Sequence, residues 1–138
     1  MTWEELNKVR DLTKELKETE RTLEILRASI AAKVPVLDGM PKPTSTDSRV
    51  ETVALRIVEL SEQADLLKNE LAEIVPALKS QISRSFTDKT ARKLFILRYV
   101  DCMYFRDIAF ILGYSETHVY YLHKIFLKNL IVDSDDFS

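Results

Sequence analysis

The stretch FRDIAFILGYSETHVYYLHK, residues 105–124, decides how the rest of the chain is interpreted. Its key residues fall at the fixed positions of a two-helix unit: Ile108, Ala109, Leu112, Gly113, Val119 and Leu122. Ala109 leaves room where two helices cross closely, and Gly113 supplies the left-handed backbone that ends the first helix. Ser115 then caps the second helix by accepting a backbone N–H hydrogen bond. The spacing predicts a helix-turn-helix, a unit that lays its second helix in the major groove of DNA.

The second helix of this unit, from Ser115 to about Leu130, has two different faces. Helical spacing gathers one apolar face that we expect in the core, formed by Val119, Leu122, Phe126 and Leu130. The opposite stripe is polar and basic, and it holds Thr117, Tyr121, Lys124 and Lys128. A hydroxyl, a phenol and two ammonium groups suit the surface of a DNA groove.

The residues of the predicted DNA-binding surface form two groups, those expected to contact base edges and those expected to contact phosphates. Hydroxyl, phenol and carboxylate groups can form hydrogen bonds with base edges, so we assign the base contacts to Glu116, Thr117, Tyr120 and Tyr121. Cationic side chains bind phosphates, so we assign the phosphate contacts to Arg92, Lys93, Arg106, Lys124 and Lys128. His118, nearby, and Ser115, at the helix start, complete the predicted DNA-binding surface. The alternative is an ordinary solvated face, but tyrosine rings are seldom left on such a surface.

The charge of the chain is unevenly distributed. The net charge is −2, yet residues 84–130 carry eight basic and four acidic side chains, an excess of four positive charges. The basic charge therefore lies where phosphate binding requires it. Because the excess is small, we expect one copy to bind DNA weakly and to lose affinity steeply with salt. Two copies on adjacent half-sites would roughly add their binding energies.

Length and composition restrict the class of protein. The 138 residues suffice for one small domain with an appended helical hairpin. No run of eighteen apolar residues occurs, and the charged start MTWEELNKVRD offers no signal-peptide core, so we expect a cytoplasmic protein. A single cysteine, Cys102, excludes an intramolecular disulfide and a cysteine-rich zinc site.

Two long amphipathic helices are predicted before this unit, over residues 2–34 and 48–83. Each starts with a capping box, Thr2 with Glu5 and Ser48 with Glu51. Apolar residues then recur every seven positions, as in the series Val9, Leu16, Leu23, Ile30 and the series Val50, Ile57, Ala64, Leu71, Leu78. Thr19 is the polar break in the first helix, and Pro76 predicts a kink in the second.

The resulting fold class is all-α, with a long antiparallel helical hairpin followed by a three-helix helix-turn-helix domain. We expect the hairpin over 1–83, with a proline-rich loop at 35–47, the DNA-binding domain over 84–131, and a disordered acidic tail over 132–138. Residues 84–87 would form a short hinge, followed by one helix from Asp88 with Leu94, Leu97 and Phe95 facing inward. Because two helices have little core of their own, the leftover apolar edge predicts a homo-oligomer.

No arrangement of residues indicates catalysis. His118 and His123 are five positions apart, which does not bring them together on one metal, so we expect no metal site and a packed His123. Phosphate-binding glycine loops, nucleophile elbows and paired carboxylates do not occur. We expect neither enzymatic activity nor a cofactor.

The segment LRYVDCMYFRDIAFILGYSETHVYYLHKIFLKNL resembles region 4 of sigma-70-type factors. It is more similar still to the ArpU/RinA-like transcriptional regulators of phages and prophages in Gram-positive bacteria, which also begin with a helical region broken by a loop like DGMPKPTSTDSRVE. The resemblance implies a regulator of phage late genes, and Arg106, Ser115, Glu116, Thr117, Tyr120, Tyr121 and Lys124 occupy positions that face DNA in the family pattern. Asp101–Cys102 replaces the usual aspartate–glycine turn, and Tyr104 replaces the usual Ser or Thr cap.

The favoured function is a sequence-specific DNA-binding transcriptional regulator that acts as an oligomer on double-stranded DNA. One alternative is a DNA-packaging subunit similar to a phage small terminase, which also joins a helix-turn-helix to a helical assembly element. Another is an adaptor whose helix-turn-helix contacts RNA polymerase in place of DNA.

Overall fold

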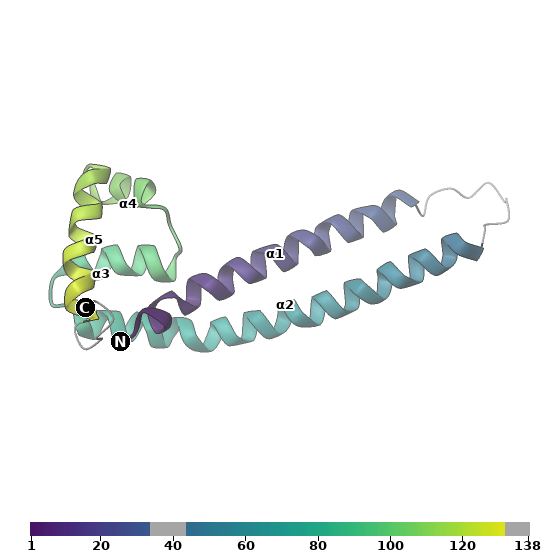
Figure 1. Cartoon of the computed structure of the whole chain (residues 1–138), viewed down its shortest axis with the longest axis horizontal. Coiled ribbons are helices and arrows are strands. Elements are labelled where there is room, and N and C mark those ends of the chain that lie inside the picture. Colours follow the sequence, from purple (N-terminus) through teal and green to yellow (C-terminus); the bar gives the residue numbers. More distant parts are fainter. Residues whose placement is uncertain (34–43, 132–138) are drawn as a thin grey trace. The chain divides into compact units, whose positions relative to one another are not determined.

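The computed structural model describes residues 1–33 and 44–131, and these residues form five α-helices and no strand (Figure 1). The helices are α1 (Trp3–Lys33), α2 (Thr44–Ser85), α3 (Lys89–Phe95), α4 (Phe105–Leu112) and α5 (Glu116–Leu130), with a π-helical segment, η1 (Ile96–Val100), directly after α3. The all-α prediction is confirmed. The predicted tail 132–138 and residues 35–43 of the predicted loop lie outside the described residues.

The start of α1 is held by the predicted capping box. The Glu5 backbone N–H donates to Thr2 Oγ1 over 3.1 Å, and the Thr2 backbone N–H donates to Glu5 Oε2 over 3.3 Å. The second predicted capping box is wrong, because α2 begins at Thr44 and Ser48 lies inside the helix. Pro76 also lies inside α2, which continues past it to Ser85.

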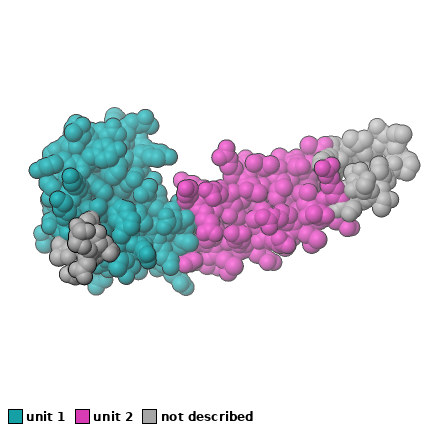
Figure 2. All heavy atoms as spheres, viewed as in Figure 1, with its two compact units in different colours: residues 1–13, 71–138 teal, residues 14–70 magenta. Residues whose placement is uncertain are grey.

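The chain divides into two compact units (Figure 2). Unit 1 consists of Met1–Thr13 and Leu71–Ser138, and unit 2 consists of Lys14–Glu70. This division differs from the boundary at residue 83 that the sequence suggested. The reason is that the first turns of α1 and the last turns of α2 pack into the same core as α3, α4 and α5.

Unit 2 is an antiparallel pair formed by parts of α1 and α2. Its apolar cluster consists of the buried Leu23, Leu60 and Ala64, with Leu16, Leu26 and Ile57 packed against them, and Leu67 is buried as well. Contacts at the edges run in opposite chain directions: Glu20 faces Lys68 at 3.7 Å, and Arg27 Nη2 donates to Ser61 Oγ at 3.3 Å. Thr19 is buried, and its hydroxyl donates to the Glu15 carbonyl over 2.9 Å, so this polar group has a partner.

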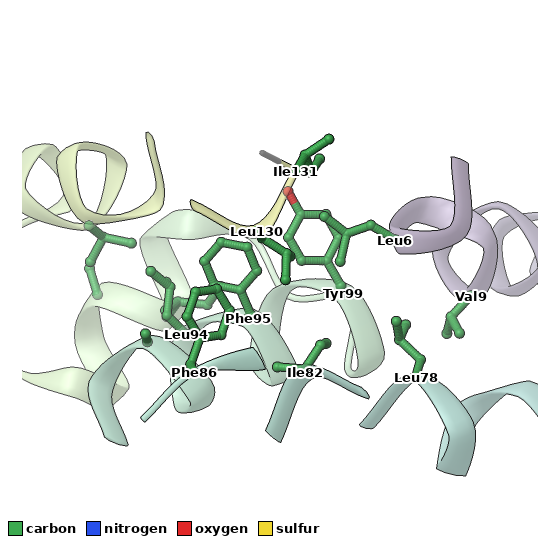
Figure 3. Close-up of a cluster of buried hydrophobic side chains, with 14 residues drawn as sticks. Leu6, Val9, Leu78, Ile82, Phe86, Leu94, Phe95, Tyr99, Leu130 and Ile131 are labelled. Carbon is green, nitrogen blue, oxygen red and sulfur yellow. The ribbon is translucent and has the colours of Figure 1, made fainter. Parts of the chain in front are cut away.

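The core of unit 1 joins residues from the two ends of the sequence (Figure 3). Side chains from α1, α2, the α3–η1 segment, α4 and α5 fill it, among them Leu6, Val9, Leu78, Ile82, Leu94, Phe95, Tyr99, Ile108, Val119, Leu130 and Ile131. The predicted break at 84–87 is displaced, because the residues between α2 and α3 are 86–88. Helix α2 extends to Ser85, and the buried Phe86 ring lies 4.9 Å from Phe95 and 5.8 Å from Phe126 between ring centroids.

The predicted third helix is divided into α3 and η1. Asp88 caps α3, because its side chain accepts a hydrogen bond from the Thr90 backbone N–H over 2.9 Å. The wider turn of η1 closes with a bond from the Asp101 N–H to the Ile96 carbonyl over 3.0 Å. Cys102 follows with a φ of 58°, a left-handed conformation that costs a non-glycine residue about 1–2 kcal/mol. Cysteine therefore occupies a backbone position suited to glycine.

The turn between α4 and α5 follows the predicted residue roles. Gly113 has a φ of 77°, and its N–H and that of Tyr114 both donate to the Ala109 carbonyl. Ser115 caps α5 by accepting from the His118 N–H over 3.1 Å. Tyr104 stands at the cap position of α4 with no side-chain cap bond. Ala109 is buried at this packed helix pair.

Gly113→Ala is expected to destabilise the protein through the backbone alone. A Cβ at this position would meet no atom within 4 Å, so the cost is that of the left-handed conformation, about 1 kcal/mol. Urea denaturation measures the free energy of unfolding, and Gly113→Asn is the matched variant, since asparagine tolerates this conformation better. Equal stability of the wild type and Gly113→Ala would contradict the assigned role.

Candidate nucleic-acid interface

Helix α5 has one buried and one exposed face, as its spacing predicts. Val119 and Leu130 are buried, and Leu122 and Phe126 pack against the core of unit 1. The exposed residues include all the predicted DNA contacts on this helix and its cap: Ser115, Glu116, Thr117, His118, Tyr120, Tyr121, Lys124 and Lys128. The hydroxyl, phenol and ammonium groups of the stripe are thus open to a ligand.

Aromatic contacts hold several of these exposed side chains in place. The His118 ring lies edge-on to Tyr114, with 4.9 Å between centroids, and nearly parallel to Tyr121 at 6.3 Å. The Tyr120 ring packs on Phe105 at 4.5 Å. Rings held by neighbours lose less side-chain entropy when a ligand binds. The first two turns of α5 are therefore a preorganised surface.

An open groove of about 430 Å³ lies where α4 and α5 begin, and it contains one cation that the sequence did not single out. Its lining combines two arginines with aromatic and acidic residues: Arg98, Arg106, Tyr104, Phe105, Tyr120 and Glu116. The Arg98 guanidinium lies 4.1 Å from the centroid of the Phe105 ring, and its Nη1 donates to the Met103 carbonyl over 2.9 Å. Only the fold brings Arg98 beside Arg106, because Arg98 belongs to η1.

Two predicted phosphate contacts lie elsewhere. Arg92 and Lys93 belong to α3 and line a different groove, which shares no lining residue with the groove at the start of α4 and α5. Arg92 is half-buried, and its Nη2 donates to the Thr87 carbonyl over 3.2 Å. The structure therefore brings most of the predicted site together on α4 and α5 and leaves these two cations apart.

His123 lies in an aromatic cluster beneath this surface, as expected for a packed histidine. Its Nε2 is hydrogen-bonded to the Tyr99 hydroxyl over 2.6 Å, and its ring stacks on Phe95 at 5.3 Å. Burial, and then the positive charges of Arg98 and Arg10, lower the pKa of His123 to about 4. Burial also raises the pKa of Tyr99 to about 12. Both groups are neutral near pH 7.

The stability of the protein is expected to fall as the pH decreases from about 6.5 to about 4. In the unfolded chain His123 binds a proton near its ordinary pKa of 6.5, whereas the folded protein binds it only near 4. Between these values the unfolded state holds more protons, so acid favours unfolding. His123→Gln should flatten the dependence between pH 6.5 and 5, as measured by urea titrations at several pH values. An equally steep dependence in His123→Gln would contradict the assignment.

No protein-family model, curated protein or solved structure matches this chain. Among the described residues, no three His, Cys, Asp or Glu side chains gather where they could hold a metal ion. Over the same residues, no helix has the length and apolar character needed to cross a membrane.

Proposed function

We propose that this protein is a sequence-specific DNA-binding transcriptional regulator, in which α4 and α5 form a helix-turn-helix of the sigma-70 region 4 type. One observation carries the proposal: α5 exposes an ordered polar and basic face, while its opposite face is buried and its start is capped by Ser115. A helix presented in this way enters the major groove with its first turns at the base edges.

The residues of this face have separate roles. Glu116, Thr117, Tyr120 and Tyr121 contact base edges, because they lie in the first turns of α5 and carry hydrogen-bonding groups. Lys124 and Lys128 follow along the same helix and contact phosphates. Arg106 contacts a phosphate from the start of α4, and His118 and Ser115 lie at the edge of this surface. The resemblance to ArpU/RinA-like regulators points to late genes of a phage or prophage, with RNA polymerase as a further partner.

The antiparallel pair of α1 and α2 serves self-association. Large apolar residues remain exposed on it after its own seam is filled, namely Ile25, Leu55, Val58 and Leu66. Three of them, Leu55, Val58 and Leu66, share one side of α2, and neighbouring exposed apolar residues are typical of interaction surfaces. Two or more copies on adjacent half-sites compensate for the small positive charge of a single copy.

Binding to promoter fragments of the protein's own genome, compared with unrelated DNA across a salt series, tests the proposal. We expect the protein to bind at least one promoter fragment about tenfold or more tightly than unrelated DNA. One bidentate base contact contributes about 1–3 kcal/mol of discrimination, which is enough for such a difference. Uniform, salt-labile binding to every fragment would leave only the phosphate contribution and would refute sequence readout.

Two variants separate base contacts from phosphate contacts on the preferred fragment. Thr117→Ala removes a predicted base contact and should reduce the preference for this fragment over unrelated DNA. Lys128→Ala removes a predicted phosphate contact and should weaken binding to both DNAs by a similar factor. If both variants weaken binding to the two DNAs equally, Thr117 does not read a base.

A further inference from the structure

Helix α4 exposes large apolar side chains that its own core does not use. Phe110 is 90% exposed and Ile111 is 50% exposed, and Tyr114 follows just after the helix end. A helix on the surface of a soluble protein usually carries polar residues on its outer side. Neighbouring exposed apolar residues are therefore typical of a surface that another protein covers.

This apolar surface continues into an open groove of about 600 Å³ formed with α3, here called the α3–α4 groove. Ile96, Ile111 and Leu112 provide its apolar lining, together with Tyr114. Its cations are Lys89, Arg92 and Lys93, and none of its lining residues in the described part of the chain is acidic. The groove thus suits a ligand that is both apolar and negatively charged.

Helix α2 carries a surface with the complementary character. Leu55, Val58 and Leu66 are exposed by 66%, 54% and 69%, and helical spacing places them on the side away from the buried Leu60 and Ala64. The exposed Glu59 and Glu62 lie on the same side. We call these five residues the α2 stripe. Glu59 is paired with Arg56 over 3.3 Å, so two such stripes would oppose like carboxylates mainly at Glu62.

We propose that the α3–α4 groove of one copy binds the α2 stripe of a second copy. The inference rests on the proposed self-association and identifies its two surfaces. Leu55, Val58 and Leu66 bury their side chains against the apolar lining of the groove, and the two glutamates face its cations. Because the surfaces differ, the contact is head-to-tail, and a pair of copies leaves one stripe free on the first copy and one groove free on the second.

A DNA ligand fits the groove less well. Phosphates would pair with Lys89 and Lys93, but they would leave Phe110 and Ile111 without an apolar partner. Burial of apolar area contributes about 25 cal/mol per Å², which a protein surface with apolar side chains supplies and phosphates do not. The periodic leucines and valine of the α2 stripe offer such a surface.

Complementation between two variants tests the proposal, with molar mass measured by light scattering. Ile111→Glu disables the groove, and Leu66→Glu disables the stripe. We expect each variant alone to remain at the monomer mass of 16.0 kDa at concentrations where the wild type associates. An equimolar mixture retains one intact groove and one intact stripe, so it should form a dimer of twice the monomer mass. Both positions are exposed, and circular dichroism checks that the helix content is unchanged.

The other outcomes are distinguishable. If either single variant assembles as the wild type does, the inference is wrong and self-association uses another surface. If both variants are monomeric and their mixture stays monomeric, the contact is not head-to-tail, which also overturns it. A wild type that is monomeric at every concentration would refute the proposed self-association as well. A loss of DNA affinity in Ile111→Glu with wild-type assembly would assign the groove to DNA.

Discussion

Replacing both Lys124 and Lys128 with alanine is expected to weaken DNA binding strongly and to reduce its salt dependence. Both side chains are exposed and lie four residues apart on the same face of α5. If each contacts one phosphate, the slope of log K against log salt should become less steep by about 2, since each contact contributes about 0.9. Fluorescence anisotropy with a duplex probe at several salt concentrations measures this slope.

The matched control removes two lysines of the same kind from another part of the chain. Lys14 and Lys17 are exposed on α1, and Lys14→Ala with Lys17→Ala makes the same change in net charge. We expect this double variant to keep the wild-type slope. Equal slopes in the two double variants would mean that α5 makes no phosphate contacts and that only the overall charge matters.

Leu6→Ala is expected to cost about 2–5 kcal/mol in the free energy of unfolding, the usual range for a fully buried leucine. Leu6 has no exposed surface, although it is near the start of the chain, and it belongs to the same core as Tyr99, Leu130 and Ile131 (Figure 3). The substitution leaves a cavity in the core on which α3 and α5 pack. Urea denaturation followed by circular dichroism measures the loss.

Leu55→Ala provides the comparison, because it removes the same atoms from a leucine that is 66% exposed. At a protein concentration where the wild type is monomeric, we expect a change within about 0.5 kcal/mol for this variant, as for most surface substitutions. If Leu6→Ala is no more destabilising than Leu55→Ala, the first turns of α1 do not contribute to the core of unit 1.

Several features of the fold and of the candidate interface were predictable because their causes are local. The capping box of Thr2 and Glu5, the cap at Ser115 and the left-handed Gly113 each involve residues within four positions of one another. The two faces of α5 follow from a period of 3.6 residues. The exposed stripe and the buried Val119 were therefore evident from spacing alone.

The errors arose where the outcome depends on distant residues. Residues 84–87 lost the periodic pattern, which suggested a hinge, but Phe86 packs between Phe95 and Phe126. The division of the third helix into α3 and η1 had no signal in its composition. Arg98 was counted as a charge but not as part of a site, because its neighbours in the groove come from α4 and α5.

The sequence by itself determined the helical class, the positions of the main helices, the α4–α5 turn and the polar face of α5. Periodicity and capping encode these features within a few residues. Only the tertiary structure decided which parts share a core, since Leu6 joins Leu130 and Tyr99 meets His123 across 24 positions. It also decided which cations gather, with Arg98 beside Arg106 and Lys93 in a separate groove. Burial and the clustering of charge depend on how the whole chain packs, and no local pattern specifies them.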